Sequence, residues 1–165
     1  MKNKKMNNKG FSLVELIIVI AIMAVLVGVI APAYLRYVEK SRKSADVQAM
    51  DAVANAMEAA AIDPSLEFDS NTKNMIVVLS NTGLVVKQED NKDTGDYVTE
   101  LEETLGNYKL KSKDWISVEI KGTVDGGSVT FTTTPTYAAN IKDENKLSEY
   151  ASDLADKLKV TEPQG

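Results

Sequence analysis

Residues 16–35 form a run of 20 residues without a single charged side chain. A helix rises about 1.5 Å per residue, so this run spans roughly 30 Å, the thickness of a membrane's hydrocarbon core. No other segment of the chain constrains its fold as strongly. We expect an N-terminal helix that crosses a membrane or packs against other apolar helices.

A short basic leader precedes this run and ends at Gly10, with Phe11 opening the apolar segment and Glu15 four residues later. The leader is basic through Lys2, Lys4, Lys5 and Lys9. An ionised group in an apolar membrane segment is costly and usually functional, so Glu15 is out of place in a plain anchor. The leader favours a cytoplasmic N-terminus, but basic residues also follow the apolar run, so charge asymmetry alone does not fix the orientation. These residues are Arg36, Lys40, Arg42 and Lys43.

This combination resembles the prepilin leader of type IV pilins and of the related pseudopilins. The resemblance implies cleavage between Gly10 and Phe11 by a membrane peptidase, and N-methylation of Phe11 as the first mature residue. It divides the chain into a leader (1–10), a transmembrane or filament-core helix (11–35), the amphipathic half of the same helix (36–62) and a globular head (63–165).

Two other interpretations compete with the prepilin leader. In an ordinary secretory signal, Ala31-Pro32-Ala33 would allow cleavage before Tyr34. In a simple signal anchor, the apolar helix would only hold an extracytoplasmic domain. The apolar run is longer than the usual 7–15 residues of a signal peptide, and neither alternative gives Glu15 a role.

An unpaired carboxylate in apolar surroundings needs a cation. In the pilin family this glutamate is thought to pair with the N-terminal amine of a neighbouring subunit, which would set the axial register during assembly. The resemblance assigns that role to Glu15. The alternative is an intramolecular bond to the amine of Phe11, one helical turn away.

Gly28 and Pro32 should make the helix softest between them. The proline ring clashes with the carbonyl four residues earlier, which belongs to Gly28, and removes one hydrogen bond. Glycine also has a weak helix preference. One interpretation is a static kink; the other, which the resemblance supports, is a segment that loses helicity and lets a filament stretch.

Nothing in the sequence interrupts the helix from Tyr34 to about Ile62. Asp63-Pro64 should end it, because the residue before proline avoids helical angles. Residues 11–62 would span roughly 78 Å. Two apolar stripes at three- and four-residue spacing predict a face that lies on a sheet; they comprise Ala45, Ala49, Ala52, Ala56 and Ala59, and Met50, Val53, Met57 and Ala61. The charged residues are expected on other faces: Glu39, Lys43, Asp46 and Glu58.

The head is predicted to contain helices and a small antiparallel sheet. Asn71 or Thr72 could cap a short helix through Leu79, and a strand could open at residues 84–86. A helix is expected at 97–105 and three or four strands between about 107 and 134, with a hairpin turn at 125–127. Alternation at Tyr108 and Leu110 is assigned to the first of these strands. Residues 143–159 show one helical pattern with Leu147, Tyr150, Ala151, Leu154 and Leu158 on its face. The expected fold class is therefore α+β: a long N-terminal helix on an antiparallel sheet, pilin-like, with an added C-terminal helix.

Composition excludes several functions. The chain has no histidine and no cysteine, which removes the commonest general base, the commonest metal ligand and any disulfide. No catalytic constellation, cofactor or metal site is predicted. The acidic loop 89–96 offers oxygen ligands for calcium, but it lacks EF-hand spacing and is expected to be a solvated loop.

Without its four leader lysines the chain keeps 15 basic and 24 acidic residues, a net charge of −9, so nucleic acid is not an expected partner. Pilins of double-membrane bacteria often carry a C-terminal disulfide, so the cysteine-free chain favours a Gram-positive source.

The resemblance predicts a structural subunit and not an enzyme. It implies a single-pass precursor in the cytoplasmic membrane, then a homopolymer in an extracellular pilus used for adhesion, motility or biofilm formation. Expected partners are a prepilin peptidase, an assembly ATPase and a membrane platform protein. The major pilin is favoured, with a minor pilin or a pseudopilin of a secretion or DNA-uptake system as alternatives. A membrane-anchored enzyme or binding domain is a further alternative, and Glu15 argues against it.

Overall fold

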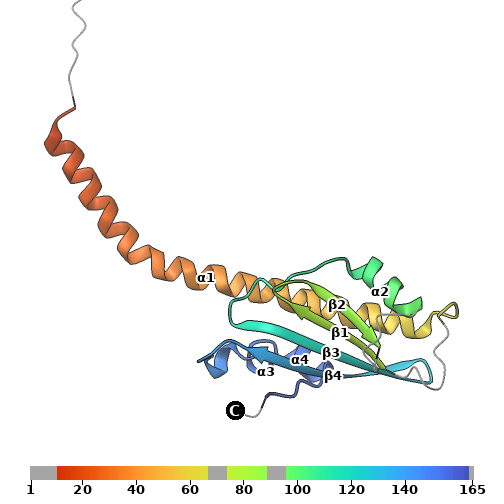
Figure 1. Ribbon diagram of the computed structural model, residues 1–165. Coiled ribbons are helices and arrows are strands. Elements are labelled where there is room, and N and C mark those ends of the chain that lie inside the picture. Colours follow the sequence, from red (N-terminus) through yellow and green to blue (C-terminus); the bar gives the residue numbers. More distant parts are fainter. Residues whose placement is uncertain (1–10, 67–73, 89–95, 164–165) are drawn as a thin grey trace, which may run out of the picture. The chain divides into compact units, whose positions relative to one another are not determined.

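The computed structural model describes residues 11–66, 74–88 and 96–163 of the chain (Figure 1). The chain forms two units, Met1–Val38 and Glu39–Gly165, which are described separately. Helix α1 (Leu13–Ile62) makes up the described part of the first unit and continues into the second. This helix confirms the prediction of a long N-terminal helix that ends before Asp63 and Pro64.

The second unit is built on a four-stranded sheet in which every neighbouring pair is antiparallel. Its order is β2 (Leu84–Gln88), β1 (Asn74–Ser80), β3 (Trp115–Asp125) and β4 (Ser128–Tyr137). The second half of α1 covers one face of this sheet (Figure 1). Helix α2 (Asp96–Leu105), the 3₁₀ turn η1 (Asp143–Asn145) and the short helices α3 (Leu147–Tyr150) and α4 (Ser152–Lys157) complete the unit. The α+β class is therefore confirmed.

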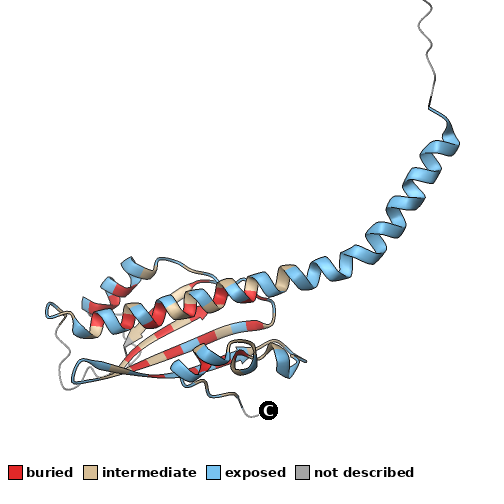
Figure 2. Ribbon diagram, turned by 180° about the vertical axis from the view of Figure 1, so that it is seen from behind, coloured by how far each residue is buried: buried red, intermediate tan, exposed pale blue. Residues whose placement is uncertain are grey.

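The core lies between the second half of α1 and the sheet, and buried residues, red in Figure 2, occur in both layers. From α1 the predicted stripe contributes Met50, Val53 and Met57, each no more than 1% exposed. Gly122 of β3 allows this close packing, because an added Cβ would lie 2.9 Å from the Val129 side chain and 3.4 Å from Met57.

The β3–β4 hairpin turns as predicted. Asp125 pairs with Ser128 across a two-residue turn made by Gly126 and Gly127. Both glycines have positive φ, at 57° and 81°. Two successive left-handed residues match the twist of the flanking strands, and glycine adopts this backbone without strain.

The predicted short helix through Leu79 is wrong, because the structure has strand β1 there. Its candidate caps, Asn71 and Thr72, lie outside the described residues. Residues 74–80 alternate between buried and half-buried positions, and three consecutive β-branched residues, Ile76, Val77 and Val78, favour a strand over a helix. The strand predicted at 84–86 is confirmed as β2, and the helix at 97–105 as α2.

The strand predicted through Tyr108 and Leu110 is also wrong. This segment has no regular secondary structure, and only the Leu110 N–H bonds to the neighbouring strand end, at the Ser80 carbonyl 2.9 Å away. The sheet instead takes β1 and β2 from residues 74–88. The next backbone N–H groups, of residues 111–113, donate to side chains of α1. These bonds take the place of the hydrogen bonds that a neighbouring strand would accept.

The single helix predicted over 143–159 is divided into η1, α3 and α4. The backbone becomes extended at Lys146 and leaves helical angles again at Ala151. Side chains from elsewhere cap the first break: the Leu147 N–H donates to the Tyr137 hydroxyl and the Ser148 N–H to Glu162. The predicted apolar face is still the packed one, since Leu147 and Leu158 are fully buried.

Candidate functional site

The first described residues carry the predicted processing and assembly positions. Gly10 lies outside the described residues, and Phe11 is 78% exposed just before α1 begins. The Ser12 N–H donates to Glu15 Oε2 at 2.9 Å. This is the reciprocal half of a capping box, in which a glutamate in the first turn satisfies a free N–H at the helix start. In the uncut chain Glu15 therefore caps its own helix, and its pairing with an amine stays a prediction.

The first unit presents an apolar surface with no cover. Every residue from 11 to 37 is exposed, and its large hydrophobic side chains are between 41% and 78% exposed (Figure 2). Within the part of the chain that the structure describes, α1 is also the one helix apolar and long enough to cross a membrane. Such a surface needs lipid or other protein around it.

Gly28 and Pro32 both lie inside α1, which continues through them. A Cβ at Gly28 would meet no other atom within 4 Å, so packing does not require glycine there. Pro32 supplies no N–H, so the Gly28 carbonyl loses its helical partner. A weak point at these residues fits the geometry, and its role in stretching stays a prediction.

The prediction that Lys43 and Asp46 lie on faces away from the core is wrong. They are 2% and 0% exposed. Residues 43, 46, 50, 53 and 57 follow one another at three- and four-residue spacing, so these two charges continue the stripe that begins with Met50. Extending that stripe towards the N-terminus was the sequence signal that could have found them.

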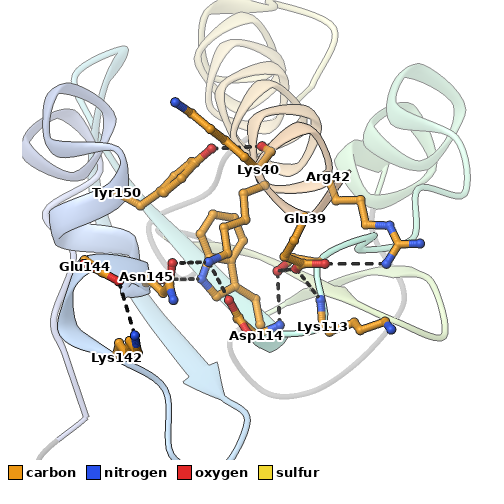
Figure 3. A network of polar contacts seen from close by, with 12 residues as sticks. Glu39, Lys40, Arg42, Lys113, Asp114, Lys142, Glu144, Asn145 and Tyr150 are labelled. Atoms are coloured by element: carbon orange, nitrogen blue, oxygen red, sulfur yellow. Dashed lines mark hydrogen bonds and ion pairs between the residues drawn. The ribbon is translucent and has the colours of Figure 1, made fainter. Parts of the chain in front are cut away.

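Asp46 and Glu39 hold the segment that leads into β3. Both oxygens of Asp46 accept from the backbone: the Lys111 N–H at 2.9 and 3.1 Å and the Ser112 N–H at 2.8 Å. The Tyr108 hydroxyl adds a third donor at 2.7 Å. Glu39 accepts from the Ser112 hydroxyl at 2.7 Å and the Lys113 N–H at 2.8 Å (Figure 3). Two carboxylates of α1 thus replace the strand ladder that this segment lacks.

Two tyrosines in this unit have raised pKa values. Burial, and then the hydrogen bond to Asp46, raises the pKa of Tyr108. Burial also raises the pKa of Tyr137, whose hydroxyl donates to Glu162 at 2.9 Å. Both groups are therefore held neutral in the folded protein.

These shifts predict a loss of stability in alkali. A tyrosine ionises near pH 10 in the unfolded chain. Because the folded-state pKa is higher, each tyrosine contributes its full stabilisation below about pH 10, and this contribution falls as the pH rises further. Tyr108→Phe should flatten the fall of the urea midpoint above about pH 10, read by fluorescence of the single tryptophan, Trp115. Tyr34→Phe, at an exposed tyrosine of the first unit, is the matched control. Equal pH profiles for the two variants would contradict the assignment.

No group of three or more histidine, cysteine, aspartate or glutamate side chains that could hold a metal occurs in residues 11–66, 74–88 and 96–163. The acidic loop predicted as a solvated segment lies outside these ranges except for Asp96, which begins α2. The calcium alternative for this loop is therefore untested.

Comparison with known proteins agrees with this geometry. Residues 5–31 match the family described as "Prokaryotic N-terminal methylation motif". The chain is 35% identical to Fimbrial protein Q of Moraxella bovis over 113 residues, covering 62% of this chain and 72% of that protein. It is 30% identical to the Type IV major alpha-pilin of Moraxella bovis over 135 residues, covering 80% and 71%. No solved structure gives a significant match.

A methylation motif at the start of a long apolar helix, with the second half of that helix on a small antiparallel sheet, defines a pilin-like protein. The chain belongs to the type IV pilin family. This is a family of structural subunits and not of enzymes.

Proposed function

We propose that this chain is the major, repeating subunit of a type IV pilus. The observation that carries the proposal is the uncovered apolar helix of residues 11–37. Burying one of its leucine, isoleucine or valine side chains contributes about 1.5–3 kcal/mol. A bilayer provides this burial for the precursor, and helices of neighbouring copies provide it in a filament, so one surface serves both states.

In this proposal a prepilin peptidase cuts between Gly10 and Phe11 and methylates the new N-terminus. An assembly ATPase and a membrane platform protein then move the subunit from the cytoplasmic membrane into an extracellular homopolymer. Its match to a major pilin supports the repeating role. Adhesion, motility and biofilm formation are the roles that such a fibre would serve. A Gram-positive source, favoured by the absence of cysteine, stays a prediction.

Deletion of the gene tests the repeating role. We expect cells without filaments by electron microscopy, and the chain as the most abundant protein in filaments sheared from the parent strain. Filaments that persist after deletion would make the chain a minor pilin. A processed chain confined to the membrane fraction would instead indicate a pseudopilin.

Pro32 is proposed to let the filament stretch. Pro32→Ala restores a backbone N–H beside the Gly28 carbonyl, so the helix between them should resist unwinding. We expect normal filament yield and less extension of single fibres under force. Gly28→Ala tests the same segment by raising helix preference while keeping Pro32. Unchanged extension in both variants would refute the proposed role.

A further inference from the structure

The buried lysine of α1 lies against an asparagine and an aspartate from two other segments. Lys43 Nζ is 2.6 Å from Asn145 Oδ1 and forms an ion pair with the Asp114 carboxylate. The lysine side chain is only 3% exposed. Figure 3 shows Asp114 and Asn145 directed towards the same point beside α1. The carboxamide of Asn145 and the carboxylate of Asp114 therefore both contact the amine nitrogen of Lys43. Lys43 and Asn145 are 102 residues apart in sequence.

Aromatic side chains cover this point. The Tyr150 ring centroid lies 5.4 Å from Lys43 Nζ, and Trp115 packs edge-on against Tyr150 at 5.8 Å between ring centroids. The indole N–H of Trp115 donates to the Asn145 carbonyl at 2.9 Å, which fixes the asparagine backbone. Trp115 itself is 1% exposed. These packed groups keep most water away from the Lys43 amine, while the Asp114 side chain is 30% exposed.

We propose that Lys43 and Asn145 join through an intramolecular amide bond, with Asp114 as the proton carrier. Asp114 takes a proton from the Lys43 ammonium, and the free amine attacks the side-chain carbonyl carbon of Asn145. The carboxyl group then gives this proton to the amide nitrogen and takes the second proton from the attacking lysine nitrogen, and the bond between the amide nitrogen and the carbon breaks. The departing ammonia accepts that second proton, so the products are the Lys43–Asn145 amide, the Asp114 carboxylate and one ammonium ion.

The chemistry needs nothing beyond these three side chains. No atom changes oxidation state, so neither an oxidant nor a reductant is required. Proton transfer from the ammonium to the carboxylate removes the lysine charge, which is costly to bury, and neutralises its partner. Holding amine and carbonyl together replaces a bimolecular encounter by an intramolecular one, which accelerates acyl transfer by orders of magnitude. A desolvated lysine beside a proton acceptor is an activated nucleophile.

The cross-link would tie the C-terminal segment to α1 in a chain that has no cysteine. Lys43 lies on α1, and Asn145 ends the turn that precedes α3. The Tyr150 hydroxyl already donates to the Lys40 carbonyl at 2.9 Å in the same place. A covalent bond here would keep the C-terminal helices on α1 under load.

A second cluster of the same residue types provides an internal comparison. Lys157 Nζ lies 3.0 Å from Asp51 Oδ1 and 3.0 Å from Asn55 Oδ1. Its lysine and aspartate side chains are 36% and 49% exposed. Water reaches and solvates this amine and carboxylate, so Lys157 and Asn55 should stay unlinked.

The test is mass spectrometry of the full-length chain purified in detergent. We expect its mass to fall below the sequence mass by one ammonia, and a branched peptide joining Lys43 to Asn145 after digestion. Lys43→Arg and Asn145→Ala should each restore the sequence mass, and Asp114→Asn should leave most molecules unlinked. Lys157→Arg, the matched control, should still show the loss of ammonia. The branched peptide excludes the leader, so processing does not affect this second readout.

A wild-type chain at its full sequence mass, with Lys43 and Asn145 in separate peptides, would overturn the proposal. So would an ammonia loss that maps to another asparagine or persists in Lys43→Arg. The wild-type mass and its mapped peptides decide the other outcomes on their own, so the proposal can be overturned even if the variants do not fold.

Discussion

Replacing Glu15 with valine is expected to leave leader cleavage unchanged and to abolish surface filaments. The carboxylate lies in an apolar helix with every neighbouring residue exposed, where a fixed charge is useful only if a cation meets it. The proposed cleavage would create such a cation at Phe11, and a neighbouring subunit would present it. The measurement is the amount of processed chain in sheared filaments compared with the membrane fraction.

Glu15→Gln separates this role from helix capping. The structure shows Glu15 accepting the Ser12 N–H, which a glutamine side chain can also do. If pairing with an amine drives assembly, glutamine should fail nearly as completely as valine. If glutamine supports normal filaments, capping is the function of Glu15 and the pairing proposal is wrong.

The second large effect is expected on the stability of the head. Asp46→Ala should lower the free energy of unfolding by about 3 kcal/mol, because hydrogen bonds to a buried carboxylate are strong and unpaired buried donors are costly. The substitution leaves the Tyr108 hydroxyl and the N–H groups of Lys111 and Ser112 without the acceptor they have in Asp46. Urea unfolding in detergent, followed by the fluorescence of buried Trp115, measures the change.

Asp51→Ala is the matched control on the same helix. Asp51 pairs with Lys157 near the surface, and an exposed ion pair contributes at most about 1 kcal/mol. The two variants should therefore differ by a clear margin. Equal losses of stability would show that the carboxylate of Asp46 does not hold the segment at residues 111–113.

The long helix and the hairpin could be predicted because their signals are local. The spacing of apolar residues predicts the helix, and Asp63-Pro64 predicts its end. The paired glycines at 126 and 127 predict the hairpin turn. Each of these signals depends only on residues close together in sequence. The apolar face of the C-terminal segment could also be predicted, but the division of this segment into short helices could not. That division depends on Tyr137 and Glu162, which cap α3 from distant positions in the chain.

The polar network on α1 was missed for the same reason. Charged residues usually mark a solvated face, and this rule misplaced Lys43 and Asp46. Their burial depends on partners that are 62 or more residues away in sequence, such as Tyr108 and Asn145. The irregular path of residues 107–112 follows from the same contacts, since α1 carboxylates satisfy the N–H groups that begin at residue 111.

The N-terminal peptide of the protein in sheared surface filaments shows whether this chain is a processed pilin subunit. Its mass is independent of any change elsewhere in the chain. We expect a peptide that begins at Phe11 and carries one added methyl group. A peptide beginning at Met1 or at Tyr34 would show that the chain is not processed as a pilin.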